Sequence, residues 1–275
     1  MLNAGELVVD RSVIRGNTAT RAGGGIEASA GSATTVQRST LSGNATGPGP
    51  GNGGGLHITA SGEVTVDRSR VTGNTAAQEG GGLWNDAAST MVVSRSVISG
   101  NSADGAKADD GGGGLFNNGG TMTVDRSEVR DNRADVGSGS GGGILNLGGG
   151  LTVDGTIVDG NSAARAGGGI EANLGTTALE RTTLSGNRTG PNPGNGGGLH
   201  LTGAGEVTLD RGLVIGNSAA NEGGGLWNDA GGTMTVTRTT ITGNSAPTGK
   251  NVFQKAPDGN FSIDGEQVPP GMNDL

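Results

Sequence analysis

The hexapeptide Gly80–Asn85, GGGLWN, decides the fold, because near-copies of it return along the whole chain. A glycine triplet followed by an aliphatic residue recurs every 26 to 32 residues. A period of this length is the signature of a solenoid, in which each repeat adds one coil to a continuous core. The other copies are GGGIEA at Gly23, GGGLHI at Gly53, GGGLFN at Gly112, GGGILN at Gly141, GGGIEA at Gly167, GGGLHL at Gly196, GGGLWN at Gly223 and a degenerate GKNVFQ at Gly249.

The composition supports a solenoid over a globular core. The chain has 275 residues, of which 60 are glycine, and only five aromatic residues. A solenoid needs only a narrow column of aliphatic side chains, which the regular return of Val, Ile and Leu supplies. Glycine without a three-residue period is not collagen. The absence of cysteine excludes disulfides and thiolate metal sites.

Charge and hydropathy narrow the function classes. The net charge of −8 and the pI near 4.7 argue against nucleic acid, which requires a basic surface. No apolar run approaches the roughly 18 residues that a transmembrane helix needs, so no membrane span is predicted. The first residues also lack the basic and apolar segments of a signal peptide.

A second landmark in each repeat ends in an asparagine. Upstream of Asn132, the alternation of Met122, Thr123 and Val124 has the two-residue period of a strand with one buried face. Asp125-Arg126 marks a corner before the next strand, and Gly-Asn closes the coil. In-register asparagines are expected to hydrogen-bond from coil to coil. They are Asn17, Asn44, Asn74, Asn101, Asn132, Asn161, Asn187, Asn217 and Asn244.

These landmarks divide each repeat into three short strands: a glycine-rich strand, a Met-Thr-Val strand and a Ser-x-Ile strand. Connections between parallel strands of this kind are right-handed. The sequence therefore predicts an all-β, right-handed parallel β-helix, a three-sheet solenoid of about nine or ten coils with the architecture of pectate lyases.

The residue after the aliphatic of the glycine-rich strand reveals an internal duplication. Its order repeats with an offset of 143 or 144 residues, and so do the lengths of the connections before the glycine triplets. We interpret the chain as one β-helix of two stacked five-coil copies, 1–143 and 144–253, with a C-terminal cap, 254–275. The ordered column is Leu2, Glu27, His57, Trp84 and Phe116, then Leu145, Glu171, His200, Trp227 and Phe253.

The two ends of the solenoid differ in the sequence. Met1 aligns inside a glycine-rich strand, so the first coil is expected to be uncovered and to favour end-to-end self-association. Residues 261–264 imitate one more strand, and the prolines of QVPPGMNDL are expected to end the ladder.

Glycine triplets followed by T-x-T-V-x-R-S-x-I-x-G-N resemble the right-handed β-helix repeats of bacterial surface and secreted proteins. These include relatives of the chlamydial polymorphic outer-membrane proteins. The resemblance covers the chain from Leu2 to about Phe253. It implies the β-helix fold, a bacterial origin, an extracellular or cell-surface location, and an adhesive role. Pectate lyases and other polysaccharide-active enzymes share the architecture, but fold alone does not define function.

The column contains the candidate functional residues. With Ile26, Leu56 and Leu83 pointing into the core, the residues that follow them are expected to point outward on a flat, open face. Glutamate beside histidine suits acid–base chemistry, so Glu27, His57, Glu171 and His200 are the catalytic candidates. An exposed indole suits a sugar ring. The predicted ligand-binding residues are Trp84, Trp227, Phe116, His57 and His200.

A purely structural role for the same residues competes with these functions. Glu–His contacts between strands stabilise a sheet face, and Trp beside Phe116 covers apolar surface. Repetition of the trio counts as one observation, because a duplication copies every residue. The structural role is the preferred interpretation.

Other patterns are interpreted as structural. A row of eight arginines, most of them preceded by an acid, predicts charge-paired corners. The row is Arg11, Arg38, Arg68, Arg95, Arg126, Arg181, Arg211 and Arg238. An interrupted threonine file, Thr35, Thr65, Thr123, Thr152, Thr208 and Thr235, leaves ice binding as a minor alternative. Asp258 to Asp264 resembles a calcium loop, but Pro269 stands where a bidentate Glu is needed. No metal site and no cofactor are predicted.

Two function classes follow. The first is a non-enzymatic solenoid that presents a flat face to a glycan or a surface protein, and this class is the preferred interpretation. The second is a polysaccharide-active lyase, hydrolase or epimerase that uses Glu, His and Trp. A concave groove with converging charges around His57 and His200 favours the enzyme, whereas a flat wall favours the binding module. A self-assembling scaffold is a minor third alternative.

Overall fold

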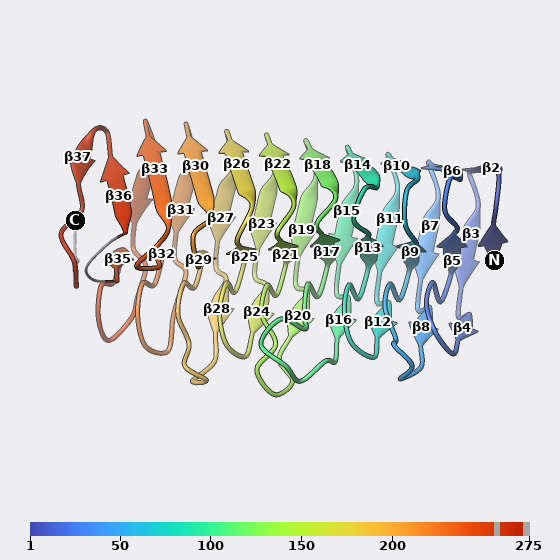
Figure 1. The fold of residues 1–275 in the computed structure, drawn as a ribbon, viewed down its shortest axis with the longest axis horizontal. Coiled ribbons are helices and arrows are strands. Elements are labelled where there is room, and N and C mark those ends of the chain that lie inside the picture. Colours follow the sequence, from blue (N-terminus) through green and yellow to red (C-terminus); the bar gives the residue numbers. More distant parts are fainter. Residues whose placement is uncertain (256–258, 272–275) are drawn as a thin grey trace.

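The computed structural model describes residues 1–255 and 259–271. Within these residues the chain consists of strands and turns and contains no helix. Figure 1 shows the coils side by side along one axis, with the first residues of the chain at one end and residues 259–271 at the other. Within the described residues all strand pairs between successive coils are parallel, and the single antiparallel pair is β36 (Asn260–Ile263) with β37 (Glu266–Gln267). The fold is a parallel β-helix, as predicted.

Four sheets run along the rod, and each takes about one strand from each coil. The first sheet carries the residues after the glycine triplets. Its strands are β1 (Leu2–Asn3), β5 (Ile26–Ala28), β9 (Leu56–Ile58), β13 (Leu83–Asn85), β17 (Leu115–Asn118), β21 (Ile144–Leu147), β25 (Ile170–Asn173), β29 (Leu199–Thr202), β32 (Leu226–Asn228) and β35 (Val252–Gln254).

The second sheet contains the longest strands, with the predicted Met-Thr-Val pattern. Its strands are β2 (Glu6–Asp10), β6 (Ala33–Gln37), β10 (Glu63–Asp67), β14 (Thr90–Ser94), β18 (Thr121–Asp125), β22 (Gly150–Asp154), β26 (Thr176–Glu180), β30 (Glu206–Asp210), β33 (Thr233–Thr237), β36 (Asn260–Ile263) and β37 (Glu266–Gln267).

The third sheet corresponds to the predicted Ser-x-Ile strands. Its strands are β3 (Val13–Arg15), β7 (Thr40–Ser42), β11 (Arg70–Thr72), β15 (Val97–Ser99), β19 (Glu128–Arg130), β23 (Ile157–Asp159), β27 (Thr183–Ser185), β31 (Leu213–Ile215) and β34 (Thr240–Thr242).

The fourth sheet was not anticipated, because its strands have two residues and no hydrophobic alternation. They lie just after the ladder asparagines, where the connections leave the third sheet. The strands are β4 (Thr18–Ala19), β8 (Ala45–Thr46), β12 (Thr75–Ala76), β16 (Ser102–Ala103), β20 (Arg133–Ala134), β24 (Ser162–Ala163) and β28 (Arg188–Thr189).

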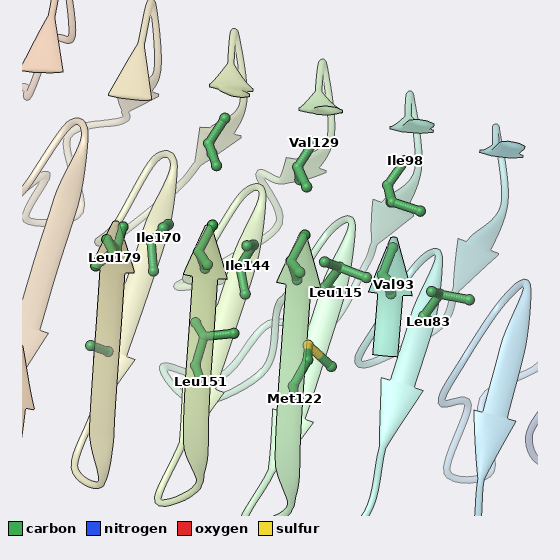
Figure 2. Packing of buried hydrophobic residues seen from close by; sticks show 14 of the residues in the cluster. Leu83, Val93, Ile98, Leu115, Met122, Val129, Ile144, Leu151, Ile170 and Leu179 are labelled. Atoms are coloured by element: carbon green, nitrogen blue, oxygen red, sulfur yellow. The ribbon is translucent and has the colours of Figure 1, made fainter. Parts of the chain in front are cut away.

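One continuous core fills the rod. Figure 2 shows that Leu83, Leu115 and Ile144 of the first sheet point toward side chains of the second and third sheets, such as Met122 and Val129. These side chains are fully buried. The core passes from the first five-coil copy into the second without interruption, because each coil packs on the next in register.

The asparagine ladder forms as predicted. Each ladder residue donates from Nδ2 to Oδ1 of the next one, as in Asn74 to Asn101 at 2.9 Å. The same Oδ1 also accepts the backbone N–H of Asn74. The ladder ends on Asn251, which accepts from Asn244. The backbone reversal itself falls on the residue before the asparagine, with φ of 62° at Gly73 and 56° at Asp131.

The second sheet ends in an antiparallel pair within the described residues. Phe261 pairs with Met234 on the second sheet and is fully buried. The chain then folds back through the antiparallel β36–β37 pair, and Val268 packs against the core. The antiparallel strand occupies the edge where a further parallel coil would add.

Candidate functional site

The column of the first sheet has the predicted register. Glu27 pairs with His57, and His57 pairs with Trp84. The same order holds for Glu171, His200 and Trp227 in the second copy. Phe116 follows Trp84, and Phe253 follows Trp227.

The expectation of a flat, exposed face is wrong. Trp84 and Trp227 are 5% and 4% exposed, His57 and His200 are 4% and 3% exposed, and Phe116 is fully buried. These side chains point away from the main core, as expected, but the connections cover them.

The first glycine of each triplet explains this burial. A Cβ built on Gly53 would lie 2.6 Å from Cβ of His57, and one on Gly80 would lie 2.9 Å from Cβ of Trp84. The chain therefore folds closely over the column residue, and only glycine allows this approach at the positive φ of 65° and 64°. The glycine triplet therefore closes the face that was expected to be open.

The indoles are therefore not sugar platforms. The ring of Trp84 stacks on His57 at 4.2 Å and on Phe116 at 6.1 Å between ring centroids. Trp227 is enclosed in the same way by His200 at 4.1 Å and Phe253 at 6.2 Å. With both faces occupied, each tryptophan instead fixes the plane of its histidine.

The longest connection separates the two histidine sites. Trp84, Phe116 and Leu145 form a second buried cluster, against which Leu147 packs. Asp109, in the connection after β16, accepts a hydrogen bond from Asn173 Nδ2 at 2.8 Å. Because Asn173 lies on β25, this connection extends across the strands that carry Phe116 and Leu145.

In the second copy, Glu171 and His200 form a buried pair. His200 Nδ1 lies 3.0 Å from Glu171 Oε2, and Thr202 Oγ1 donates to Glu171 Oε1 at 2.6 Å. Burial opposes ionisation of Glu171, but the charge and hydrogen bond of His200, with help from Arg165 and Thr202, bring its pKa below the usual value. The contact through Nδ1 leaves Nε2 of His200 without a hydrogen bond to the described residues.

A cavity of about 310 Å³ lies beside this pair. His200 and Thr202 line it together with the side chains of four charged residues. Those residues are Arg165, Glu222, Asp229 and Lys255. Lys255 Nζ lies 3.0 Å from Asp229 and 5.6 Å from the centroid of Trp227. Burial tends to raise the pKa of Asp229, but hydrogen bonds from Gly203, Lys255 and Ala230 lower it overall. The site is thus concave and carries converging charges.

The first copy arranges the same residue types differently. Glu27 pairs with Arg21, and only a long hydrogen bond of 3.4 Å joins it to Thr59. The contact of His57 Nδ1 with Thr59 Oγ1, at 3.1 Å, is the same as that of His200 Nδ1 with Thr202 Oγ1 in the second copy. Burial, with the positive charge of Arg21, lowers the pKa of His57 to about 4, although Asp86 acts in the opposite direction. A neutral, enclosed imidazole beside a charge-paired glutamate is a structural arrangement.

Each indole also donates a hydrogen bond to a glutamate that the sequence analysis did not identify as a site residue. Trp84 Nε1 donates to Glu79 Oε2 and Trp227 Nε1 donates to Glu222 Oε2, both at 3.0 Å. Burial raises the pKa of Glu79 to about 7; the hydrogen bond from Trp84 opposes the shift, while Asp110 and Asp109 add to it.

Sequence reasoning missed Arg21, Thr59, Glu79 and their counterparts Arg165, Thr202 and Glu222. The signal was present: each lies at the same offset from its column residue in both copies. Thr59 and Thr202 stand two residues after the histidines, and Glu79 and Glu222 stand five before the tryptophans. Local offsets of this kind carry contact information only once the path of the connection is known.

The arginine row forms the predicted charge-paired corners. Arg38 bonds to Asp10, Arg181 to Asp154 and Arg238 to Asp210, in each case one coil away. All eight arginines of the row have φ between 43° and 51°, and Gly155, at the equivalent corner between Arg126 and Arg181, has a φ of 54°. These ion pairs are exposed to solvent. We interpret them as links between neighbouring coils on the surface of the rod.

Within the described residues, no three acidic or histidine side chains converge as metal ligands, and no helix has the length and hydropathy to span a bilayer. Asp258 of the calcium-like segment lies outside the described residues.

Fold and site together define a parallel β-helix with a polar, aromatic column beneath its connections. Comparison with protein families identifies the family, because residues 3–246 match the model of the right-handed β-helix region. The chain therefore belongs to the right-handed β-helix family. No match was found among curated proteins or among solved structures.

Proposed function

We propose that this β-helix binds a glycan in the cavity beside His200. The observation that carries the proposal is the convergence of Arg165, Glu222, Asp229 and Lys255 on a concave site of about 310 Å³. A cavity of this size accommodates about one sugar residue. The setting that the sequence resemblance implies, a bacterial cell surface or secretion, agrees with such a ligand.

The balance of charges supports a hydroxyl-rich ligand. Two cations and two carboxylates line the cavity, so a strongly charged polymer of either sign meets repulsion from half of them. Sugar hydroxyls both donate and accept hydrogen bonds, and they satisfy a mixed lining without a net charge.

Acid–base processing of the bound glycan is the second candidate, and the Glu171–His200 pair favours it. A carboxylate on Nδ1 orients the imidazole and leaves Nε2 for proton transfer at the cavity. The concave shape is what the enzymatic alternative requires. Binding is the step that both candidates share.

The first experiment is a glycan-array screen followed by calorimetric titration of the best probe. His200→Ala is expected to weaken binding at least tenfold, because it removes a lining residue and the partner of Glu171. His57→Ala serves as the matched control, since His57 contributes to no comparable charged cavity among those described. Equal effects of the two substitutions, or no binding by the wild type, would contradict the proposal.

A second assay separates binding from turnover. Release of reducing ends or unsaturated products from the bound glycan is measured for the wild type and for Glu171→Gln. Turnover that is lost in the variant while binding is retained supports the enzyme, and binding without any turnover supports the binding module.

End-to-end self-association stays a prediction. The first coil exposes Leu2 and Val13, at 69% and 65%. Sedimentation at rising protein concentration tests the prediction, and a monomer throughout would contradict it.

A further inference from the structure

A second cavity, of about 390 Å³, lies on the other side of the Gly190–Asn195 connection from the first. Pro191 and Asn192 line this cavity, whereas Pro193 and Asn195 line the one beside His200. One short segment of chain therefore forms a wall of both cavities.

The alternation of connection lengths builds this cavity. The connection between Asn161 and Gly167 has five residues, and its neighbours after Asn132 and Asn187 have eight each. The short connection forms the floor with Ser162, Ala163 and Ala164, and the longer ones form the walls. Asn192 Nδ2 donates to the backbone oxygen of Gly137 at 3.0 Å and ties the two walls together.

The polar side chains of the cavity are held in place, but Asp135 and Arg188 do not pair with each other. Ser162, which is 2% exposed, donates from Oγ to Asp135 Oδ2 at 2.8 Å. Arg188 lines the same cavity, and its guanidinium makes no ion pair or hydrogen bond with the described residues. The hydroxyl of Thr189 is buried without a partner there. A carboxylate and a guanidinium that share a cavity without pairing are available to a ligand.

The two copies of this connection differ where the cavity is lined. Residues 44–57 and 187–200 differ at only two positions: Ala45 becomes Arg188, and Gly49 becomes Asn192. Both of these polar side chains face the cavity. The glycines, prolines and ladder asparagine that shape the connection are the same in both copies, so the polar lining is specific to the second.

We propose that this cavity is a second sugar subsite, which binds the neighbouring residue of the glycan held beside His200. The inference rests on the proposed function. Asp135 accepts hydrogen bonds from ligand hydroxyls, while Arg188 and the amide of Asn192 donate to ring and hydroxyl oxygens. A chain that crosses the Pro191–Pro193 segment occupies both cavities, so affinity rises with chain length.

The test is a length series: neutral glucose, mannose and galactose oligosaccharides of one to four units, titrated calorimetrically. For the wild type, the longer probes are expected to bind more tightly than the monosaccharide. The double variant Arg188→Ala, Asn192→Gly restores the residues of the first copy on the same backbone, and circular dichroism verifies its folding. The affinity ratio between four-unit and one-unit probes is expected to fall about tenfold.

Arg126→Ala is the matched control, because it removes an exposed arginine from a corner remote from the connections. Nitrogen-15 NMR adds a direct readout: the side-chain amide of Asn192 and the indole of Trp227 both shift with long probes, while the indole of Trp84 does not. A length dependence that survives the double variant would overturn the second subsite and leave the proposed function standing. Absence of binding by the wild type to every probe would overturn both.

Discussion

The Glu27–His57–Trp84 and Glu171–His200–Trp227 trios share residue types and register, yet their electrostatics differ. Glu171 is 1% exposed and lies 3.0 Å from His200 Nδ1 as well as 3.5 Å from Arg165, whereas the side chain of Glu27 is 19% exposed and pairs with Arg21. Arg165 also donates from Nε to Ser140 Oγ at 2.9 Å, so the arginine near Glu171 is shared with a neighbouring coil. Duplicated residues therefore acquire distinct chemistry from their contacts with other coils.

The largest effect expected on this comparison comes from the tryptophans. Trp84→Ala should lower the free energy of unfolding by about 3 to 5 kcal/mol, because it leaves a cavity in the buried Trp84–Phe116–Leu145 cluster. Trp227→Ala should cost less, because its aromatic stack ends on Phe253 beside the exposed Lys255. Urea denaturation followed by fluorescence measures each, since the remaining indole reports its own half. The comparison fails if Trp227→Ala is the more destabilising change.

The next effect concerns Glu79, the carboxylate that accepts a hydrogen bond from the indole of Trp84. The pKa of Glu79 is raised to about 7, so the folded state binds a proton that the unfolded chain releases near 4.5. Stability from this group is complete below about pH 4.5 and is lost as the pH rises to about 7. Glu79→Gln should therefore be about 2 kcal/mol more stabilising at pH 8 than at pH 5, by urea denaturation. A Glu79→Gln variant whose stability keeps the pH dependence of the wild type would refute the assignment.

Substitution of Glu171 and Glu27 directly tests the electrostatic difference between the two trios. Glu171→Gln should lower stability by about 1 to 3 kcal/mol, because it removes the buried carboxylate charge beside His200 and weakens the hydrogen bond that Thr202 donates. Glu27→Gln should cost about 1 kcal/mol or less, since half-exposed Arg21 is its main partner. Thermal and urea denaturation give both values. A larger loss for Glu27→Gln would reverse the conclusion.

The smallest effect concerns the corners, where Gly155 of the second copy replaces Arg11 of the first. Arg181→Gly should change stability by less than about 1 kcal/mol: it removes exposed ion pairs but relieves a φ of 49°. Arg181→Ala removes the same pairs and keeps the backbone conformation, so it should be about 1 kcal/mol less stable than the glycine variant. Denaturation curves that coincide would show that the arginine corners store no backbone strain.

The sequence by itself determined the coil count, the strand register, the asparagine ladder and the column from Leu2 to Phe253. These follow from periodicity, because an in-register parallel stack places each repeat position directly over its equivalent. The interpretation as two five-coil copies rests on the same alignment. The fourth sheet was not predicted, because strands of two residues show no hydrophobic period.

Only the tertiary structure decided whether the column faces solvent. Burial of His57 and Trp84 depends on the path of the connections, and the approach of Gly53 and Gly80 to the column sets that path. The lengths of the connections can be read from the sequence, but their paths in space cannot. The pairing of His200 with Glu171, and the cavities on either side of residues 190–195, arise from contacts between different coils. Those contacts depend on three-dimensional packing of irregular backbone, which has no period for a sequence to display.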